Sequence, residues 1–290
     1  MMIEWNECDE ATTGFSYGGR STGKFAPAQR KEEEFICMRF AIPITKTVKK
    51  LVCVAFCVTS VVVHASMSNS DIEIATGGEN ALVIMMHGLG DTPVGWSQMA
   101  RNFKPNLPHV KWILPCAPEN PVSVNGGMKM TSWMDILEIP IAVRSPDNGK
   151  DIDSSIGIVN KIVEAELAKG NIKPERIVIG GFSQGGALAI ASSLRLDKRI
   201  GGFFSLSGWC LPRQNVQELA KRSVNNNVPV FIGHGSADNV VLYENAEQSK
   251  KYFEDANFKD ITFKAYANMG HSSCPEETND LLRWLSKVLA

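Results

Sequence analysis

The sequence predicts an α/β fold, in which a mostly parallel central sheet is flanked by helices within a single domain. From about residue 71, short runs rich in apolar and β-branched residues alternate with longer amphipathic stretches. This alternation is typical of a parallel sheet covered by helices. Most of the short runs are continuously apolar, as strands buried on both faces are. The expected strands are residues 81–86, 110–114, 176–179, 202–206, 228–232 and 261–266.

Amphipathic helices are expected between these strands. In residues 153–169, the side chains of Ile156, Val159 and Val163 fall on one helical stripe, and Gly170 follows as a stop signal. The remaining expected helices are residues 185–196, 245–256 and 275–289.

The composition is that of an ordinary globular protein and disfavours a nucleic-acid partner. Of the 290 residues, 44% are hydrophobic and 21% are charged, which fits a chain that buries a large core. The 30 basic and 31 acidic residues give a formal net charge of -1. No global field therefore attracts nucleic acid or an anionic membrane surface.

The N-terminal part differs from the rest in composition. Residues 1–70 are expected to be a disordered extension and residues 71–290 the folded domain. The apolar run at 51–65 is shorter than the roughly 20 residues that a spanning helix needs. Read from Met38, the segment that ends at residue 65 resembles a cleavable signal peptide, whereas a mispredicted gene start, with translation from Met67, is the alternative.

Cysteine usage favours a reducing compartment. The folded domain holds only Cys116, Cys210 and Cys274, and an odd, sparse set reads as free thiols rather than a disulfide framework. The sequence therefore predicts a cytoplasmic protein.

The segment around Ser183 carries the strongest chemical signal. Residues 181–185 form a Gly-x-Ser-x-Gly motif between an expected strand and an expected helix. In this context the glycines allow a sharp turn that exposes the serine hydroxyl above the sheet, as in the nucleophile elbow of α/β-hydrolases. The alternative is a glycine-rich turn without chemistry, and the flanking strand and helix favour the nucleophile.

A serine nucleophile needs a histidine base and an acid that orients the base. In α/β-hydrolases these residues follow the serine in the order acid, then histidine. Asp238 follows an expected strand, and His271 precedes the last helix. The rival acids, Glu244 and Asp255, fall on an expected helix. The sequence therefore predicts a triad of Ser183, Asp238 and His271 in an α/β-hydrolase catalytic domain.

Two backbone N–H groups are expected to bind the oxyanion of the reaction. Residues 87–91 follow the first strand of the domain, where hydrolases supply one donor, and the residue after the nucleophile supplies the other. We assign these donors to Leu89 and Gln184. For His87 a structural role in the loop is preferred to a catalytic one.

Several motifs in this order resemble the acyl-protein thioesterases, also called small cytosolic lysophospholipases, and the related bacterial carboxylesterases. The resemblance runs from about Ala81 to the C-terminus and leaves the first 70 residues without a counterpart. The motifs that carry it are residues 87–92, 115–118, 132–135, 180–187, 206–209 and 271–274.

The resemblance implies the same catalytic residues, Ser183, Asp238 and His271, and the same oxyanion donors, Leu89 and Gln184. It also implies hydrolysis of S-acyl cysteine, chiefly palmitoyl, on cytosolic proteins. The chain departs from the family's pattern in two places. The loop before the acid reads His-Gly-Ser-Ala-Asp, where the family often has an acidic residue after His-Gly, and a variant Leu-Ser-Gly-Trp-Cys-Leu-Pro segment puts the chain-length preference in doubt.

The stretch at residues 122–141 is unusually apolar for a connection and contains three methionines. A flexible, methionine-rich surface suits an acyl chain. We expect Met130, Trp133 and Trp209 to bind the substrate, mainly because of the resemblance. The alternative is that these side chains are ordinary core residues.

The predicted activity is depalmitoylation of S-acylated proteins through an acyl-enzyme, with no cofactor. One alternative is a carboxylesterase or lysophospholipase that acts on small esters or lysolipids. An alternative of another class is a non-catalytic binder of lipidated partners. No metal site is expected, because His271 and Cys274 have no second ligand pair at suitable spacing. The expected partners are S-acylated proteins or small acyl esters, with transient contact at a membrane surface.

Overall fold

The computed structural model describes residues 70–147, 149, 151–211 and 215–290. Within these residues, seven strands form one sheet and two more form a separate hairpin. The sheet strands are β1 (Ile72–Ile74), β2 (Ala81–Met86), β3 (Val110–Leu114), β6 (Ile177–Phe182), β7 (Gly202–Leu206), β8 (Val230–Gly235) and β9 (Ile261–Tyr266). The hairpin strands are β4 (Glu119–Val122) and β5 (Met128–Thr131).

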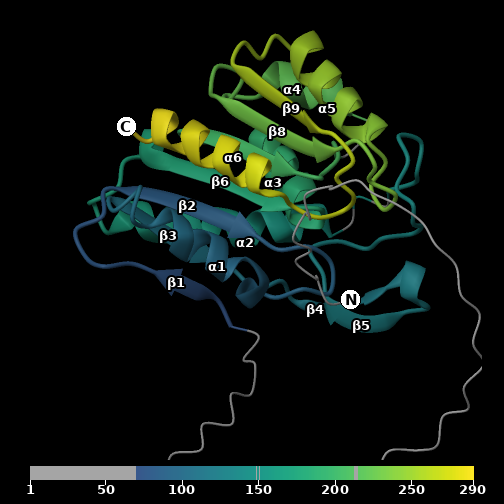
Figure 1. Cartoon of the computed structure of the whole chain (residues 1–290), viewed down its shortest axis with the longest axis horizontal. Coiled ribbons are helices and arrows are strands. Elements are labelled where there is room, and N and C mark those ends of the chain that lie inside the picture. The colour runs from purple at the N-terminus through teal and green to yellow at the C-terminus, as the bar shows by residue number, and fades with distance from the viewer. Residues whose placement is uncertain (1–69, 148, 150, 212–214) are drawn as a thin grey trace, which may run out of the picture. The chain divides into compact units, whose positions relative to one another are not determined.

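The order across the sheet is β1-β3-β2-β6-β7-β8-β9. Each neighbouring pair is parallel except β1 with β3. The helices lie on the two faces of this sheet (Figure 1). They are α1 (Pro93–Phe103), α2 (Ile152–Ala168), α3 (Gln184–Arg195), α4 (Val216–Arg222), α5 (Glu244–Asp255) and α6 (Pro275–Val288). Two short 3-10 turns, η1 (Ser123–Asn125) and η2 (Pro174–Arg176), complete the described elements. The predicted α/β-hydrolase fold is confirmed.

The central strands are buried on both faces, which explains their continuous apolar runs. On β2, Leu82 and Ile84 pack with α2 and α3, whereas Val83 and Met85 pack with α1 and α6. All four side chains are at most 1% exposed. Such burial removes most of the apolar surface of these strands from water. Each Å² of apolar surface that is buried stabilises the fold by roughly 25 cal/mol.

The expected strands and helices are found, with ends shifted by no more than three residues. The elements absent from the expectation are β1, α1, α4 and the β4–β5 hairpin. Each has a weak local signal: β1 has only three residues, α1 carries Gly95 in its first turn, α4 has only seven residues, and β4 contains Pro121. Pairing and packing with distant segments form these elements, and sequence periodicity does not report such contacts.

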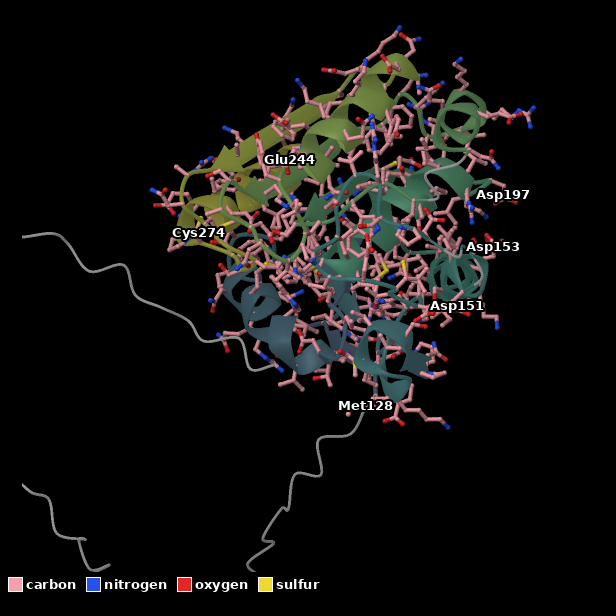
Figure 2. All side chains as sticks on the ribbon, turned by 90° about the vertical axis from the view of Figure 1, so that its right-hand side faces the viewer. Met128, Asp151, Asp153, Asp197, Glu244 and Cys274 are labelled. Carbon is pink, nitrogen blue, oxygen red and sulfur yellow. The ribbon has the colours of Figure 1, made fainter. Side chains whose placement is uncertain are left out.

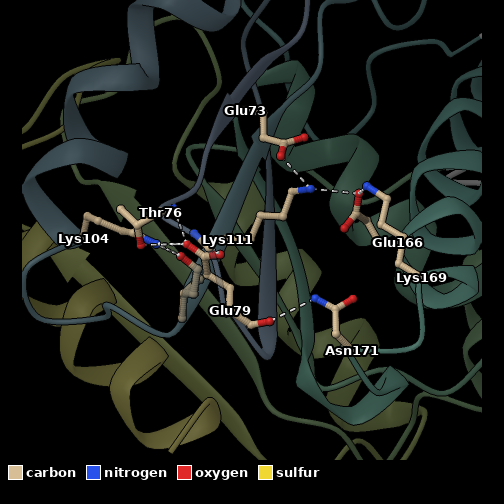
Figure 3. Close-up of polar contacts among 10 residues, drawn as sticks. Glu73, Thr76, Glu79, Lys104, Lys111, Glu166, Lys169 and Asn171 are labelled. Atoms are coloured by element: carbon tan, nitrogen blue, oxygen red, sulfur yellow. Dashed lines mark hydrogen bonds and ion pairs between the residues drawn. The ribbon is translucent and has the colours of Figure 1, made fainter.

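A buried lysine ties the edge of the sheet to a covering helix (Figure 3). The ammonium of Lys111 on β3 lies 2.8 Å from Glu73 on β1 and 3.0 Å from Glu166 on α2. Lys169 approaches the same Glu166 carboxylate to 2.6 Å. Burial alone would raise the pKa of Glu166, but the two lysines lower it. Because Lys111 would be costly to bury without these partners, the network fixes β1 and α2 against β3.

A second ion pair secures the turn that precedes β2 (Figure 3). Lys104 lies 2.7 Å from the buried carboxylate of Glu79, which also accepts hydrogen bonds from Thr76. Burial opposes ionisation of this carboxyl, yet the bonds from Lys104 and Thr76 lower its pKa from 4.5 to about 2. The turn is therefore held by a carboxylate that stays charged throughout the neutral range.

No helix in the described ranges is long and apolar enough to span a membrane. The apolar run at 51–65, and with it the signal-peptide interpretation, lies outside the described residues. The division into a 70-residue extension and a catalytic domain stays a prediction.

A buried carboxyl of α6 lacks a polar partner. Glu277 is fully buried, and neither of its oxygens has a hydrogen-bond partner among the described residues. Burial raises its pKa from 4.5 to about 8. Glu277 is therefore protonated at neutral pH.

Glu277→Gln should flatten the pH dependence of stability. Between about pH 4.5 and 8 the folded chain holds a proton on Glu277 that the unfolded chain releases. The free energy of unfolding therefore falls as the pH rises through this window, and a neutral amide removes that slope. Melting temperatures measured from pH 5 to 8.5 test this. Glu276→Gln, at an exposed neighbour, should keep the wild-type slope, and an equal slope in both variants would contradict the prediction.

Candidate active site

Ser183 sits at a sharp turn between β6 and α3. Its backbone has φ 54° and ψ −117°, a conformation that is strained for a residue with a side chain. The turn requires glycines beside it: a Cβ on Gly185 would lie 2.2 Å from the carbonyl oxygen of Met86, and one on Gly181 would lie 2.4 Å from the backbone of Gly185. The strand, the helix and the neighbouring β2 therefore approach closely only because these side chains are absent.

Three loops bring a hydrogen-bonded relay together. The Ser183 hydroxyl lies 2.9 Å from His271 Nε2, and His271 Nδ1 lies 2.7 Å from Asp238 Oδ2. Ser183 follows β6, Asp238 follows β8 and His271 follows β9. In parallel strands these loops leave the same edge of the sheet, where such folds place their ligands. The structure thus joins the three residues that the sequence singled out as a triad.

Asp238 is held as a carboxylate. Its Oδ1 accepts the backbone N–H groups of Val240 and Val241, each at 2.9 Å. Its Oδ2 faces His271 and, at 3.3 Å, Nε2 of His234. Burial alone would raise the pKa of Asp238, but the hydrogen bonds from His234, His271 and Val240 hold it well below its usual range.

The charge on Asp238 decides where the protons of His271 lie. A carboxylate only accepts hydrogen bonds, so Nδ1 of His271 carries the proton that faces it. In the neutral ring, Nε2 then has a free lone pair directed at the hydroxyl of Ser183. The relay has the direction that a general base requires.

His234 is a polar contact of the site to which the sequence assigned no role. It is fully buried, and its Nε2 lies 2.8 Å from the carbonyl oxygen of Val241. Because a carbonyl only accepts, Nε2 carries a proton, which is shared with Asp238. The His-Gly pair at the end of the apolar strand β8 is the local signal, but only the fold shows that the ring reaches Asp238.

The two expected oxyanion donors are available. Gln184 is the first residue of α3, so its N–H has no partner within the helix and lies at the positive end of the helix dipole. Leu89 follows β2. Among the described residues, neither backbone N–H donates a hydrogen bond to another group. Their role as oxyanion donors stays a prediction.

His87 has the contacts of a structural residue. Its Nε2 accepts the backbone N–H of Ala117 at 3.0 Å, so its Nδ1 donates to the carbonyl oxygen of Gly88 at 2.7 Å. Burial lowers the pKa of His87, and the ring is neutral at pH 7. The contacts agree with the structural role preferred for this residue.

The three residues expected to bind an acyl chain lie in different surroundings. Met130 is half-buried, and its sulfur lies 3.6 Å from the position of a Cβ on Gly90. Trp133 has no exposed surface, which corresponds to the alternative of a core residue. Trp209 is 3% exposed and borders a pocket. The apolar residues of this pocket include Met134, Ile136, Leu137, Ile141, Ile152 and Leu211.

No group of three or more His, Cys, Asp or Glu side chains in the described part of the chain could hold a metal ion. Cys274 is partly exposed after the His271 loop, and its pKa is raised, chiefly by burial. A raised pKa disfavours the thiolate, so Cys274 is a poor nucleophile at neutral pH.

Comparison with known proteins settles the family. A family model described as phospholipase/carboxylesterase matches residues 67–289. The chain belongs to this family. Within the phospholipase/carboxylesterase family, it is 37% identical to acyl-protein thioesterase 1 of Kluyveromyces lactis and 39% identical to that of Saccharomyces cerevisiae. Each alignment covers 72% of this chain and 92% of the relative. The resemblance to acyl-protein thioesterases is confirmed.

Two solved structures of plant proteins resemble this fold. SOBER1 of Arabidopsis thaliana is 33% identical, with a TM-score of 0.68 over 73% of this chain and 100% of the other. Acyl-protein thioesterase 2 of Zea mays is 30% identical, with a TM-score of 0.68 over 76% and 99%.

Replacement of the acid distinguishes Asp238 from its rivals. Asp238→Asn should lower kcat by about 10³- to 10⁴-fold with little change in KM, because the amide no longer enforces the required tautomer of His271. Steady-state kinetics with a soluble acyl thioester measure this. Asp255→Asn and Glu244→Gln alter exposed carboxylates on α5 and should keep the wild-type kcat. Figure 2 labels Glu244. A large loss in either control would contradict the assignment.

Proposed function

We propose that this protein is a serine hydrolase that removes acyl groups, most readily palmitoyl, from cysteines of S-acylated proteins. The observation that carries the proposal is the relay from Ser183 through His271 to Asp238, with distances of 2.9 Å and 2.7 Å. It occurs in a chain whose relatives are acyl-protein thioesterases. The relay supplies a serine nucleophile with its base.

In the first half of the reaction, the Ser183 hydroxyl attacks the carbonyl carbon of the thioester. His271 Nε2 takes the hydroxyl proton, and the carbonyl π electrons move onto the oxygen. The N–H groups of Leu89 and Gln184 stabilise this oxyanion. The C–S bond then breaks, the acyl group stays on Ser183, and the departing cysteine leaves with its sulfur protonated by His271.

In the second half, water replaces the thiol. His271 takes a proton from the water as its oxygen attacks the acyl carbon of the Ser183 ester. The second tetrahedral intermediate uses the same two N–H groups. When it collapses, the fatty acid leaves and the proton returns to the Ser183 oxygen.

The pocket beside Trp209 supports a long acyl chain as the preferred substrate. Its lining combines apolar side chains, among them Met134, Ile141 and Leu211, with carboxylates such as Asp135 and Glu138. Each methylene buried against the apolar part would contribute about 0.8 kcal/mol. Small esters and lysolipids are a second candidate class, supported by the family's description as phospholipase/carboxylesterase. A non-catalytic binder is disfavoured because such a scaffold has no need of the complete hydrogen-bonded relay.

We further propose that residues 71–290 form the catalytic domain after an extension at residues 1–70, and that the protein is cytoplasmic. The relay lies in residues 183–271, and the matched family model begins at residue 67, which supports residues 71–290 as the catalytic domain. The proposed cytoplasmic location rests on the sparse, odd cysteine usage of the domain, with Cys116, Cys210 and Cys274. Intact-mass measurement of the protein from cells would show which start is used, and a mass that begins after residue 65 would support the signal-peptide alternative.

Substitution of the nucleophile tests the activity. Ser183→Ala should reduce hydrolysis of a palmitoyl thioester to background and abolish labelling by a fluorophosphonate probe, because no other group can form the acyl-enzyme. Rates on a palmitoyl thioester and on a short nitrophenyl ester rank the two substrate classes. Failure of the wild-type protein to react with the probe would contradict the hydrolase and favour the binder.

Met130 tests where the acyl chain lies. Met130→Ala should lower kcat/KM for a soluble octanoyl thioester by about 3- to 10-fold and for an acetyl thioester by less than about 2-fold, since only the longer chain loses apolar contact. The matched control is Met128→Ala, because Met128 is 65% exposed at the periphery of the described residues (Figure 2). Equal losses on both thioesters would exclude a chain contact at Met130.

A further inference from the structure

The two proposed oxyanion donors belong to separate elements. Leu89 lies in the loop at residues 87–91, here named the donor loop, and Gln184 begins α3. An oxyanion hole works only when its donors are preorganised at a fixed spacing. The segment Thr131, Ser132, Trp133 and Met134, here named the bridging segment, contacts the donor loop on both sides of Leu89 and the side chain of Gln184.

A hydrogen bond from the indole of Trp133 fixes the N-terminal end of the donor loop. Its Nε1–H donates to the carbonyl oxygen of His87 at 3.0 Å, and the His87 and Trp133 rings lie 5.4 Å apart. Both side chains are at most 1% exposed. In such a dry environment the hydrogen bond is strong, and its loss leaves a buried acceptor unsatisfied.

Thr131 holds the other side of the donor loop. Its carbonyl oxygen accepts the N–H of Gly90 at 2.9 Å, and its hydroxyl donates to the carbonyl oxygen of Asp91 at 2.6 Å. Leu89 is therefore bracketed by hydrogen bonds on both sides, from residues 131 and 133.

The side chain of Gln184 is bound to the same bridging segment. Its Oε1 accepts the backbone N–H of Trp133 at 2.8 Å. Its Nε2 donates to the Ser132 hydroxyl at 3.0 Å and to the carbonyl oxygen of Met134 at 2.6 Å. Gln184 is 1% exposed, so these bonds fix the residue whose backbone N–H is the second proposed donor.

The bridging segment is also hydrogen-bonded to helix α2. The hydroxyl of Ser155 on α2 donates to the carbonyl oxygen of Trp133. The N–H, the carbonyl and the indole of Trp133 are therefore all hydrogen-bonded to different parts of the fold. Trp133 is the one residue of the segment that contacts both the donor loop and Gln184.

We infer that Trp133 is a positioning residue, which sets the spacing of the two oxyanion donors by holding the donor loop and Gln184 to one segment. The inference rests on the proposed function. It assigns Trp133 an effect on the transition state rather than on acyl-chain binding. Small displacements of a donor weaken its bond to the oxyanion more than they weaken ground-state binding.

Trp133→Phe is the direct test, because it removes the indole N–H and keeps an aromatic ring. We expect kcat to fall about 10-fold, with KM changed by less than about 3-fold. This fall in kcat is smaller than the 10²- to 10³-fold that is typical when an oxyanion donor is lost outright. A trifluoromethyl ketone, whose adduct with Ser183 carries an oxyanion, should lose affinity by a similar factor.

Trp112→Phe is the matched control. Trp112 is equally buried, but its indole nitrogen has no hydrogen-bond partner among the described residues, and it packs against Phe103. It should lower the melting temperature without changing kcat or ketone affinity. Thr131→Val, which removes only the hydroxyl bond to Asp91, should lower kcat and ketone affinity together and gives a second route if Trp133→Phe folds poorly.

The outcomes separate the inference from the proposed function. A wild-type protein that hydrolyses thioesters, with a Ser183→Ala variant that does not, supports the function whatever Trp133 does. Against that background, a Trp133→Phe protein that keeps wild-type kcat and ketone affinity would overturn the inference. A rise in KM alone, confined to long acyl chains, would also overturn it and place Trp133 in the chain-binding surface.

Discussion

The hydrogen bond between His271 and Asp238 is the interaction on which the chemistry of this protein depends. Asp238 is buried, yet donors from Val240, Val241 and His234 keep it charged. Its charge fixes the proton of His271 on Nδ1, and only then does Nε2 accept the proton of a hydroxyl. A buried carboxylate without those donors would bind a proton itself and leave the imidazole free to take the wrong tautomer.

The parallel sheet makes this bond possible across large separations in sequence. The three reactive side chains follow β6, β8 and β9, whose carboxyl ends lie at one edge. The close approach of β2, β6 and α3 at Gly181 and Gly185 places the donor loop beside Ser183. The site is therefore assembled by rigid strands and short loops, so little conformational entropy remains to be lost when a substrate binds.

Apolar residues of a single stretch of the chain have different surroundings in this fold. The apolar stretch at residues 122–141 was expected to form a substrate surface, yet Trp133 within it is fully enclosed and hydrogen-bonded. Met128 at the start of β5 is largely exposed, and Met130 two residues later is half-buried. Apolar character alone does not distinguish these environments, because a core and an acyl groove have the same composition.

The sequence by itself determined the central strands, the longer helices, the family and the three residues of the relay. Continuous apolar runs, helical spacing and the glycines around Ser183 are local signals, and the order of Asp238 and His271 follows from the direction of the chain. The tertiary structure alone decided the contact of His234 with Asp238, the unpaired carboxyl of Glu277 and the bonds of Trp133 to His87 and Gln184. Each of these joins a group to surroundings built from other elements, and hydrogen bonding and desolvation depend on those surroundings rather than on neighbours in sequence.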